Sequence, residues 1–227
     1  MVDRPLSATA PVEISEKSIE QKQGSFEEKK KDLTSIPDEI IPTDTITSKS
    51  EDNGDDKKEA LAETLKTLMK KGAKEWNKYR KEHPGELFDE ALKESNLSGF
   101  DLSSFDLSNL NLKEATLINT NFKNCNMTGV NIKEANVQGA VFENANLTGA
   151  DMKELVMNGN NLKNAVLKGA NLKEITLTNC DLTGAVLTGC NLSEAVIENC
   201  TFKGAVLDHT TMLPPGFDAT GSGLKFE

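Results

Sequence analysis

Residues 171–190, NLKEITLTNCDLTGAVLTGC, carry a leucine at every fifth position: Leu172, Leu177, Leu182 and Leu187. A β-strand alternates its faces at every residue, so an odd step places successive leucines on opposite faces. An α-helix turns about 100° per residue, so a step of five rotates the side chain by roughly 140° net. Neither element keeps these leucines on one side, and another arrangement must bring them together.

The five-residue step continues without a slip from Leu97 to Met212, which predicts 24 units. Two positions before each central residue the side chain is usually small, and the two residues after it are polar and typical of turns. Each unit therefore predicts a short strand followed by a corner. Four such units close a square, residues twenty apart stack, and the central residues all point into one column.

Several units resemble the motif A(D/N)LXX of the pentapeptide-repeat family, as in ANLTG (145–149), ANLKE (170–174) and CNLSE (190–194). The segment EWNKYRKEHPGELF (75–88) is similar to the stretch that precedes the repeats in some bacterial members. The resemblance covers residues 95–213. It implies a mainly β fold, a right-handed quadrilateral β-helix of about six coils. At about 4.8 Å per coil the rod is roughly 29 Å long.

The sequence divides into four segments. Residues 1–56 are polar and rich in proline, which predicts a disordered acidic leader. Residues 57–94 predict a capping region, with an amphipathic helix over 57–83 that covers the first coil and a short second helix over 86–94. Residues 95–213 form the β-helix. Residues 214–227 form a C-terminal cap with Phe217 as its plug, because coils bury their core only against neighbours and end coils need covers.

The charge and the cysteines exclude several classes of protein. The net charge is −10, and no segment is strongly basic, which argues against direct binding of nucleic acid. No apolar run has the length of a signal peptide or a membrane span, so we expect a cytoplasmic protein, with translocation into a host cell as an open alternative. The four cysteines are expected to be reduced. Cys180 and Cys200 stack at a distance that permits a disulfide, but parallel side chains disfavour one and core filling is the preferred interpretation.

The twenty-residue stacking also predicts columns on the surface. A lysine column runs beside a glutamate column, either as a self-neutralising face or as a docking strip for a partner protein. Outward valines predict an apolar strip, with strand propensity as the alternative explanation. Corner glycines are expected at positive φ, and Asn160 is expected to find backbone partners inside the rod. The candidate partner-binding residues are Lys113, Lys133, Lys153, Lys173, Glu114, Glu134, Glu154, Glu174 and Glu194, together with Val166, Val186 and Val206 and, on the neighbouring face, Val156 and Val196.

Two functional hypotheses follow, and neither is enzymatic. The chain has only two histidines, no Cys/His metal spacing and no nucleophile–base pair, so no catalytic residue, cofactor or metal is predicted. The first hypothesis is a bacterial protein–protein interaction scaffold, similar to effectors that intracellular bacteria deliver into host cells. The second comes from family members that mimic DNA and bind DNA gyrase. Residues 95–213 depart from that pattern because their 12 acids are interleaved with 8 bases, and the Pro/Gly-rich end cannot form a dimerisation helix.

Overall fold

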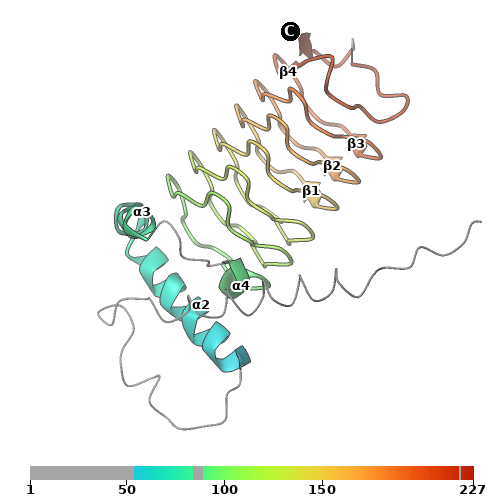
Figure 1. Ribbon diagram of the computed structural model, residues 1–227. Helices are drawn as coiled ribbons and strands as arrows, with labels where there is room; N and C mark the ends of the chain where they lie inside the picture. Colours follow the sequence, from blue (N-terminus) through green and yellow to red (C-terminus); the bar gives the residue numbers. More distant parts are fainter. Residues whose placement is uncertain (1–53, 84–88, 220) are drawn as a thin grey trace, which may run out of the picture. The chain divides into compact units, whose positions relative to one another are not determined.

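The structure is a computed structural model that describes residues 54–83, 89–219 and 221–227 (Figure 1). The chain divides into two units, residues 1–43 and 44–227, and every described residue belongs to the second unit. The leader predicted for residues 1–56 therefore lies outside the described residues, except for its last three positions. Those three open helix α2 (Gly54–Lys70).

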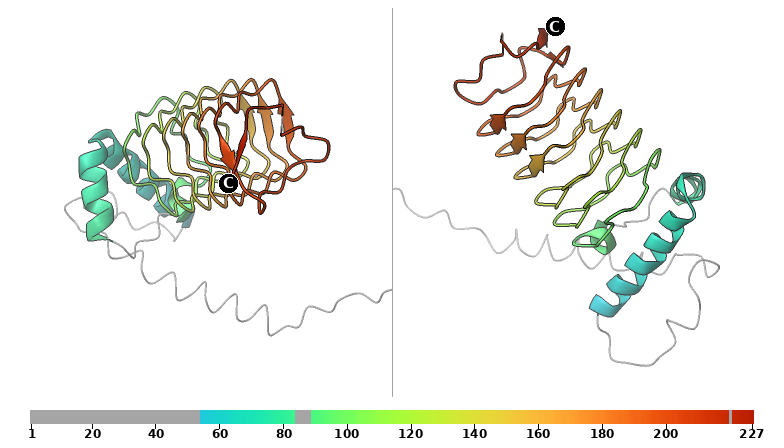
Figure 2. Two further views of the ribbon diagram at one scale, coloured as in Figure 1. Left: turned by 90° about the horizontal axis from the view of Figure 1, so that it is seen from above. Right: turned by 180° about the vertical axis from the view of Figure 1, so that it is seen from behind.

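The repeat region is a β-helix solenoid in which residues twenty apart pair in parallel. The pairing begins at Asn96 with Thr116 and continues to Val186 with Val206. Where the pairing lengthens, it forms strands β1 (Val156–Asn158), β2 (Thr176–Thr178) and β3 (Val196–Glu198), which stack in that order. Figure 2 shows the coils succeeding one another along one axis. The predicted stacking of residues twenty apart is confirmed.

Each coil has four sides, which are named here by their contents. The β1–β3 side has the central residues Leu97, Leu117, Val137, Met157, Leu177 and Ile197, and the phenylalanine side follows it with Leu102, Phe122, Phe142, Leu162, Leu182 and Phe202. The valine side has Leu107, Met127, Leu147, Leu167, Leu187 and Leu207, and the Lys/Glu side has Leu112, Ile132, Met152, Leu172 and Leu192. All of these side chains except Ile197 are buried and form the core.

Where the residue before the central residue is Asn or Asp, it holds its own coil and can link it to the next. Asn121, for example, accepts a hydrogen bond at Oδ1 from the Lys123 N–H (3.0 Å), which closes the turn. Its Nδ2 donates to Asp101 Oδ1 in the coil below (3.0 Å). Because both functions need a short side chain with an oxygen next to the backbone, asparagine and aspartate dominate this position.

The residue two after each central residue forms the corner. Every fifth residue from Glu94 to Gly204 has φ between 53° and 72°, the left-handed region that glycine tolerates best. The corner glycines expected at positive φ, Gly129, Gly149, Gly169 and Gly189, are all there.

The predicted helix over 57–83 is wrong in one respect, because it is broken into two. Helix α2 ends at Lys70, and α3 (Ala73–Glu82) begins after Gly72, whose φ of 99° ends the first helix. The second helix predicted over 86–94 is shorter, α4 (Asp89–Leu92), and residues 84–88 lie outside the described part. Within the described residues, no helix combines the length and apolar character needed to cross a membrane.

The last unit predicted by the five-residue step is also wrong. Met212 does not enter the core as a central residue but is 52% exposed. It pairs with Asn191, twenty-one residues away, and its carbonyl accepts a hydrogen bond from the Leu192 N–H (2.7 Å). The extra residue lies in the loop that Asp208 organises. Beyond it the chain returns as β5 (Lys225–Phe226), which pairs with β4 (Val206–Leu207).

Candidate functional site: a lysine and glutamate ladder

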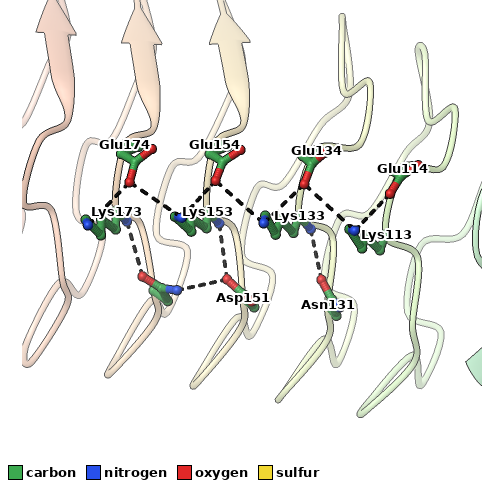
Figure 3. A network of polar contacts seen from close by, with 11 residues as sticks. Lys113, Glu114, Asn131, Lys133, Glu134, Asp151, Lys153, Glu154, Lys173 and Glu174 are labelled. Carbon is green, nitrogen blue, oxygen red and sulfur yellow. Dashed lines mark hydrogen bonds and ion pairs between the residues drawn. The ribbon is translucent and has the colours of Figure 1, made fainter. Parts of the chain in front are cut away.

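Lysines and glutamates form one continuous ladder of ion pairs along a corner of the solenoid (Figure 3). Lys113 Nζ lies 2.9 Å from Glu114 in its own coil and 3.9 Å from Glu134 in the next coil. The same zigzag repeats up to Lys173, which lies 3.3 Å from Glu174 and 3.0 Å from Glu194. The two columns predicted from the sequence are therefore adjacent, and each lysine bridges two coils. The intervening pairs are Lys133 with Glu134 and Glu154, and Lys153 with Glu154 and Glu174.

The local backbone positions both columns. Each lysine directly follows a buried central residue, and its N–H donates to the preceding Asn or Asp, as in Lys133 to Asn131 (3.0 Å). The glutamate then takes the corner position. Since consecutive coils share this geometry, charges of one sign stack while opposite charges lie side by side.

The pairing favours the charged form of both side chains. The Glu134 carboxylate, which accepts a hydrogen bond from Lys133, raises the pKa of Lys133 above its usual range. Glu154 likewise raises the pKa of Lys153, and the hydrogen bond from Lys153 lowers the pKa of Glu154. For Lys173, the hydrogen bond with Glu194 is the largest cause of its raised pKa.

The lysine and glutamate columns extend one coil further toward the N-terminus than the sequence predicts. Lys93 and Glu94 form an ion pair at 2.9 Å, and the Glu94 N–H donates to Lys113 O (2.9 Å), as a corner residue does. The hydrogen bond from Lys93 lowers the pKa of Glu94. These residues were assigned to the short helix over 86–94. Subtracting twenty from Lys113 and Glu114 would have found them.

Glutamate is confined to this one corner column. Of the corner residues from 94 to 204, all six on the Lys/Glu side are glutamate: Glu94, Glu114, Glu134, Glu154, Glu174 and Glu194. The other three corner columns contain nine glycines, seven asparagines and one serine. A left-handed conformation costs a residue with a Cβ roughly 1–2 kcal/mol, and asparagine bears it better than glutamate. The backbone therefore does not explain the choice of glutamate.

The family comparisons agree with this repeat structure. The family model described as "Pentapeptide repeat region" matches residues 98–172, and the model described as "Pentapeptide repeats (8 copies)" matches residues 161–199. Residues 98–199 are therefore pentapeptide repeats. The comparison with curated proteins gave no match.

Three solved structures illustrate what this pentapeptide-repeat protein is similar to. The protein alr5209 from Nostoc is 27% identical, with 51% of this chain and 84% of that chain covered and a TM-score of 0.31. HetL from Nostoc, which is involved in the regulation of heterocyst differentiation, is 24% identical (58% and 66% covered, TM-score 0.36). QnrB1, a plasmid-mediated fluoroquinolone resistance protein, is 19% identical (60% and 84% covered, TM-score 0.26).

The predicted valine strip is not one surface. Val166, Val186 and Val206 do stack on one another, but they are half-buried on the valine side. Val156 and Val196 belong to the β1–β3 side, with Thr176 between them. Units two apart in a four-unit coil lie on opposite sides, so placing the two valine groups on neighbouring faces was wrong. Val156 and Val196 are the exposed members, at 66% and 48%.

The inward small residues of this pentapeptide-repeat protein fill the core and also donate hydrogen bonds. Cys190 Sγ donates to Leu167 O (2.8 Å), and Asn160 Nδ2 donates to Val137 O (2.8 Å) and Ala140 O (2.9 Å), as expected for Asn160. All four cysteines are free thiols. Burial raises the pKa of Cys125 and of Cys190 to about 12, so both stay protonated.

No catalytic arrangement can be assigned to the described residues. His83 Nδ1 lies 2.9 Å from Tyr79 O at the end of α3, and His209 lies in the loop that follows β4. Within residues 54–83, 89–219 and 221–227, no group of three or more His, Cys, Asp or Glu residues could hold a metal ion. The Lys/Glu ladder is therefore the candidate site that the geometry supports.

Proposed function

We propose that this pentapeptide-repeat protein is a non-catalytic scaffold that binds a partner protein through the Lys/Glu ladder. The observation that carries the proposal is the exclusive use of glutamate at one strained corner column. An ion pair at a solvated surface contributes about 0–1 kcal/mol, which at most offsets the conformational cost of the corner. Because stability does not account for glutamate here, a surface property supplies the reason.

The ladder is suited to a partner whose surface charges are also regularly spaced. The charges of the ladder alternate in sign across the corner and repeat once per coil. An extended or helical surface with complementary charges can therefore contact several coils at once. The lysine and glutamate side chains remain about one-third exposed in the middle of the ladder, as for Lys153 (28%) and Glu154 (35%). They are thus accessible while each is held in one orientation.

The experiment compares three baits in affinity capture from an extract of the source cells, with identification by mass spectrometry. The ladder variant is E114N/E134N/E154N/E174N. The matched control, D101N/D106N/E143Q/D181N, removes the same number of acids from other sides. We expect the parent and the control to enrich the same protein and the ladder variant to lose it. Equal enrichment by the ladder variant, or no enrichment by the parent over that variant, contradicts the proposal.

The same ladder variant tests the stability argument. Asparagine occupies seven other corners, so we expect the thermal midpoint of the ladder variant to stay within a few degrees of the parent. If the thermal midpoint instead falls by ten degrees or more, the ladder stabilises the fold. The exclusive use of glutamate at this corner would then no longer support a binding role.

The alternative function, mimicry of DNA toward DNA gyrase, is tested directly by supercoiling in the presence of a fluoroquinolone. Duplex DNA presents phosphates of one sign only, whereas every lysine from Lys113 to Lys173 in the ladder pairs with two glutamates. We therefore expect no inhibition of supercoiling and no protection from drug-induced cleavage at micromolar protein. Protection at that concentration would favour the gyrase alternative over the scaffold.

A further inference from the structure

The C-terminal coil of the solenoid has a pairing or packing segment on three sides, and its fourth side has no pairing partner among the described residues. Met212 pairs across the Lys/Glu side, β5 pairs across the valine side, and the Phe217 ring lies against Phe202 on the phenylalanine side (5.7 Å between centroids). No described segment pairs with β3 on the β1–β3 side, where the chain would otherwise complete its next coil.

The inward side chains on this side are more exposed in the last coil than in the coil below. In the coil below, Ile175 and Leu177 are buried at the two inward positions of this side, and Cys180 is buried at the first inward position of the next side. Their stacked equivalents Ala195, Ile197 and Cys200 are only half-buried. Val196 beside them is 48% exposed. The inward side chains of Ala195, Ile197 and Cys200 therefore form a small, partly exposed apolar surface along β3, which is called the apolar floor here.

The backbone of β3 also lacks its partners on this edge. In the coil below, the corner donor Asn179 N–H bonds to Glu198 O (2.9 Å), and one coil lower the Gly159 N–H bonds to Thr178 O (2.9 Å). Among the described residues, the Asn199 N–H has no backbone acceptor, and the Ile197 N–H, which in this register would donate to the next coil, faces no paired strand. An unpaired edge strand with free donors is a template for a further strand.

The charges around the edge define the occupant. Glu194 ends the ladder with its side chain 63% exposed, and Glu198 has no ion-pair partner among the described residues. From these observations we propose that the β3 edge binds an extended basic–apolar peptide of a partner protein as an added parallel strand. A medium apolar residue covers Ile197, and lysine or arginine lies over Glu198. This surface shares only Glu194 with the Lys/Glu ladder, and either proposal can be correct without the other.

The probe is the blocked peptide KATLKNK, which copies the pattern of a unit on this side with lysines aligned to Glu194 and Glu198. The control peptide KATPKNK keeps the charge, but its centre lacks the leucine side chain that covers Ile197, and proline fixes φ away from strand values. We expect KATLKNK to bind with Kd of about 10⁻⁴ M and the control peptide not to bind. In amide NMR spectra, Ile197 and Asn199 N–H should shift and exchange more slowly with solvent. Equal binding of both peptides overturns the proposal.

Three protein variants locate the contact. Glu198→Lys should weaken KATLKNK about fivefold or more, because it replaces an attraction by a repulsion. Gln138→Lys is the matched control, at the equivalent position three coils away, and should leave Kd unchanged. Ile197→Lys places a charge on the apolar floor and should abolish binding, with its thermal midpoint measured to verify folding. An unchanged Kd for Glu198→Lys overturns the proposal even if Ile197→Lys fails to fold.

Two further outcomes separate this inference from others. The ladder variant E114N/E134N/E154N/E174N should bind KATLKNK normally, so failure of the scaffold proposal does not affect this result. Sedimentation velocity at the same protein concentration should show monomer. Association that is lost in Glu198→Lys would assign the edge to a second copy of this chain and overturn the peptide proposal.

Discussion

The two ends of the solenoid are closed by different means. At the N-terminal end, side chains of α3 take the place of a missing coil: Trp76 Nε1 donates to Asp106 O (2.7 Å), and Arg80 donates to Ser108 O (2.6 Å). At the C-terminal end, the chain continues its own pattern through Met212 and β5. A helix ends the ladder of backbone hydrogen bonds, because its own backbone groups are already paired. A strand only moves the free edge outward by one coil.

Because of this difference, we expect the N-terminal cap to contribute more to stability and the C-terminal edge to be more available for binding. Trp76 is fully buried and lies beside Phe105, with 6.1 Å between ring centroids. At the other end, Phe226 is 61% exposed and Ile197 is half-buried. We therefore expect substitutions at the N-terminal cap to cost much more stability than substitutions at the C-terminal end.

The largest expected effect is that of Trp76→Ala. Removing a fully buried tryptophan and its hydrogen bond to Asp106 should lower the free energy of unfolding by about 3–5 kcal/mol. Urea unfolding followed by circular dichroism measures this loss. Trp76→Phe keeps a ring against Phe105 and should lose less than half as much. A loss below about 1 kcal/mol for Trp76→Ala would mean that α3 is no cap.

Asn77→Ala should have the next largest effect. Its Oδ1 accepts from the Asp106 N–H (2.7 Å), and its Nδ2 donates to Ser104 O (3.0 Å), so alanine leaves both backbone groups without a protein partner. We expect a loss of about 1–2 kcal/mol. Hydrogen exchange of the Asp106 amide should accelerate toward that of Asn199 at the open end. Lys78→Ala, an exposed change on the same helix, serves as the control and should leave both quantities unchanged.

The repeat architecture could be predicted because one rule is repeated many times. A single stacking interval of twenty residues fixes the central column, the Asn and Asp positions and the two columns of the ladder. Lys93 and Glu94 lie twenty residues before Lys113 and Glu114 and so follow the same interval. They were not recognised because they lie in a segment with a helical pattern. The two ends depend on single contacts, which no repetition reveals.

The errors in the prediction have local physical causes. Gly72 lies in a periodic helical pattern, and glycine inside a helix is often tolerated, so the break at φ 99° gave no sequence signal. Met212 keeps the five-residue spacing by coincidence, because the Asp208 loop adds one residue. Val156 and Val166 both point outward, but they are ten residues apart. Ten residues are half a coil, so the two side chains lie on opposite sides of the solenoid.

A smaller effect is expected from the aromatic residues after the last coil. Phe217→Ala removes an edge-to-face contact with Phe202, which is only 4% exposed, and should cost about 1 kcal/mol. Phe226→Ala removes a ring that is mostly in solvent and should change the stability by less than about 0.5 kcal/mol. Urea unfolding of both variants provides the comparison. Equal losses would show that β5, rather than the Phe217 contact, closes this end.

The smallest effect concerns pH and the loop that shifts Met212. Hydrogen bonds to Asp208, first from the Thr210 hydroxyl (2.7 Å) and then from the Gly189 N–H (3.0 Å), lower the pKa of Asp208 to about 2 from its ordinary 3.8. A carboxyl group with a lowered pKa contributes stability above its unfolded value, and this contribution is lost as pH falls from about 4 to about 2.

Asp208→Asn should therefore lower the thermal midpoint by a few degrees at pH 7 and match the parent at pH 2. Thr210→Val removes the first-named donor and should move the titration of the Asp208 carboxyl upward in NMR spectra. If that carboxyl titrates near 4 in the parent, the loop is not held by Asp208. Another contact would then have to hold the loop that contains the extra residue before Met212. The C-terminal end would also be less constrained, relative to the end capped by α3, than the hydrogen bonds to Asp208 indicate.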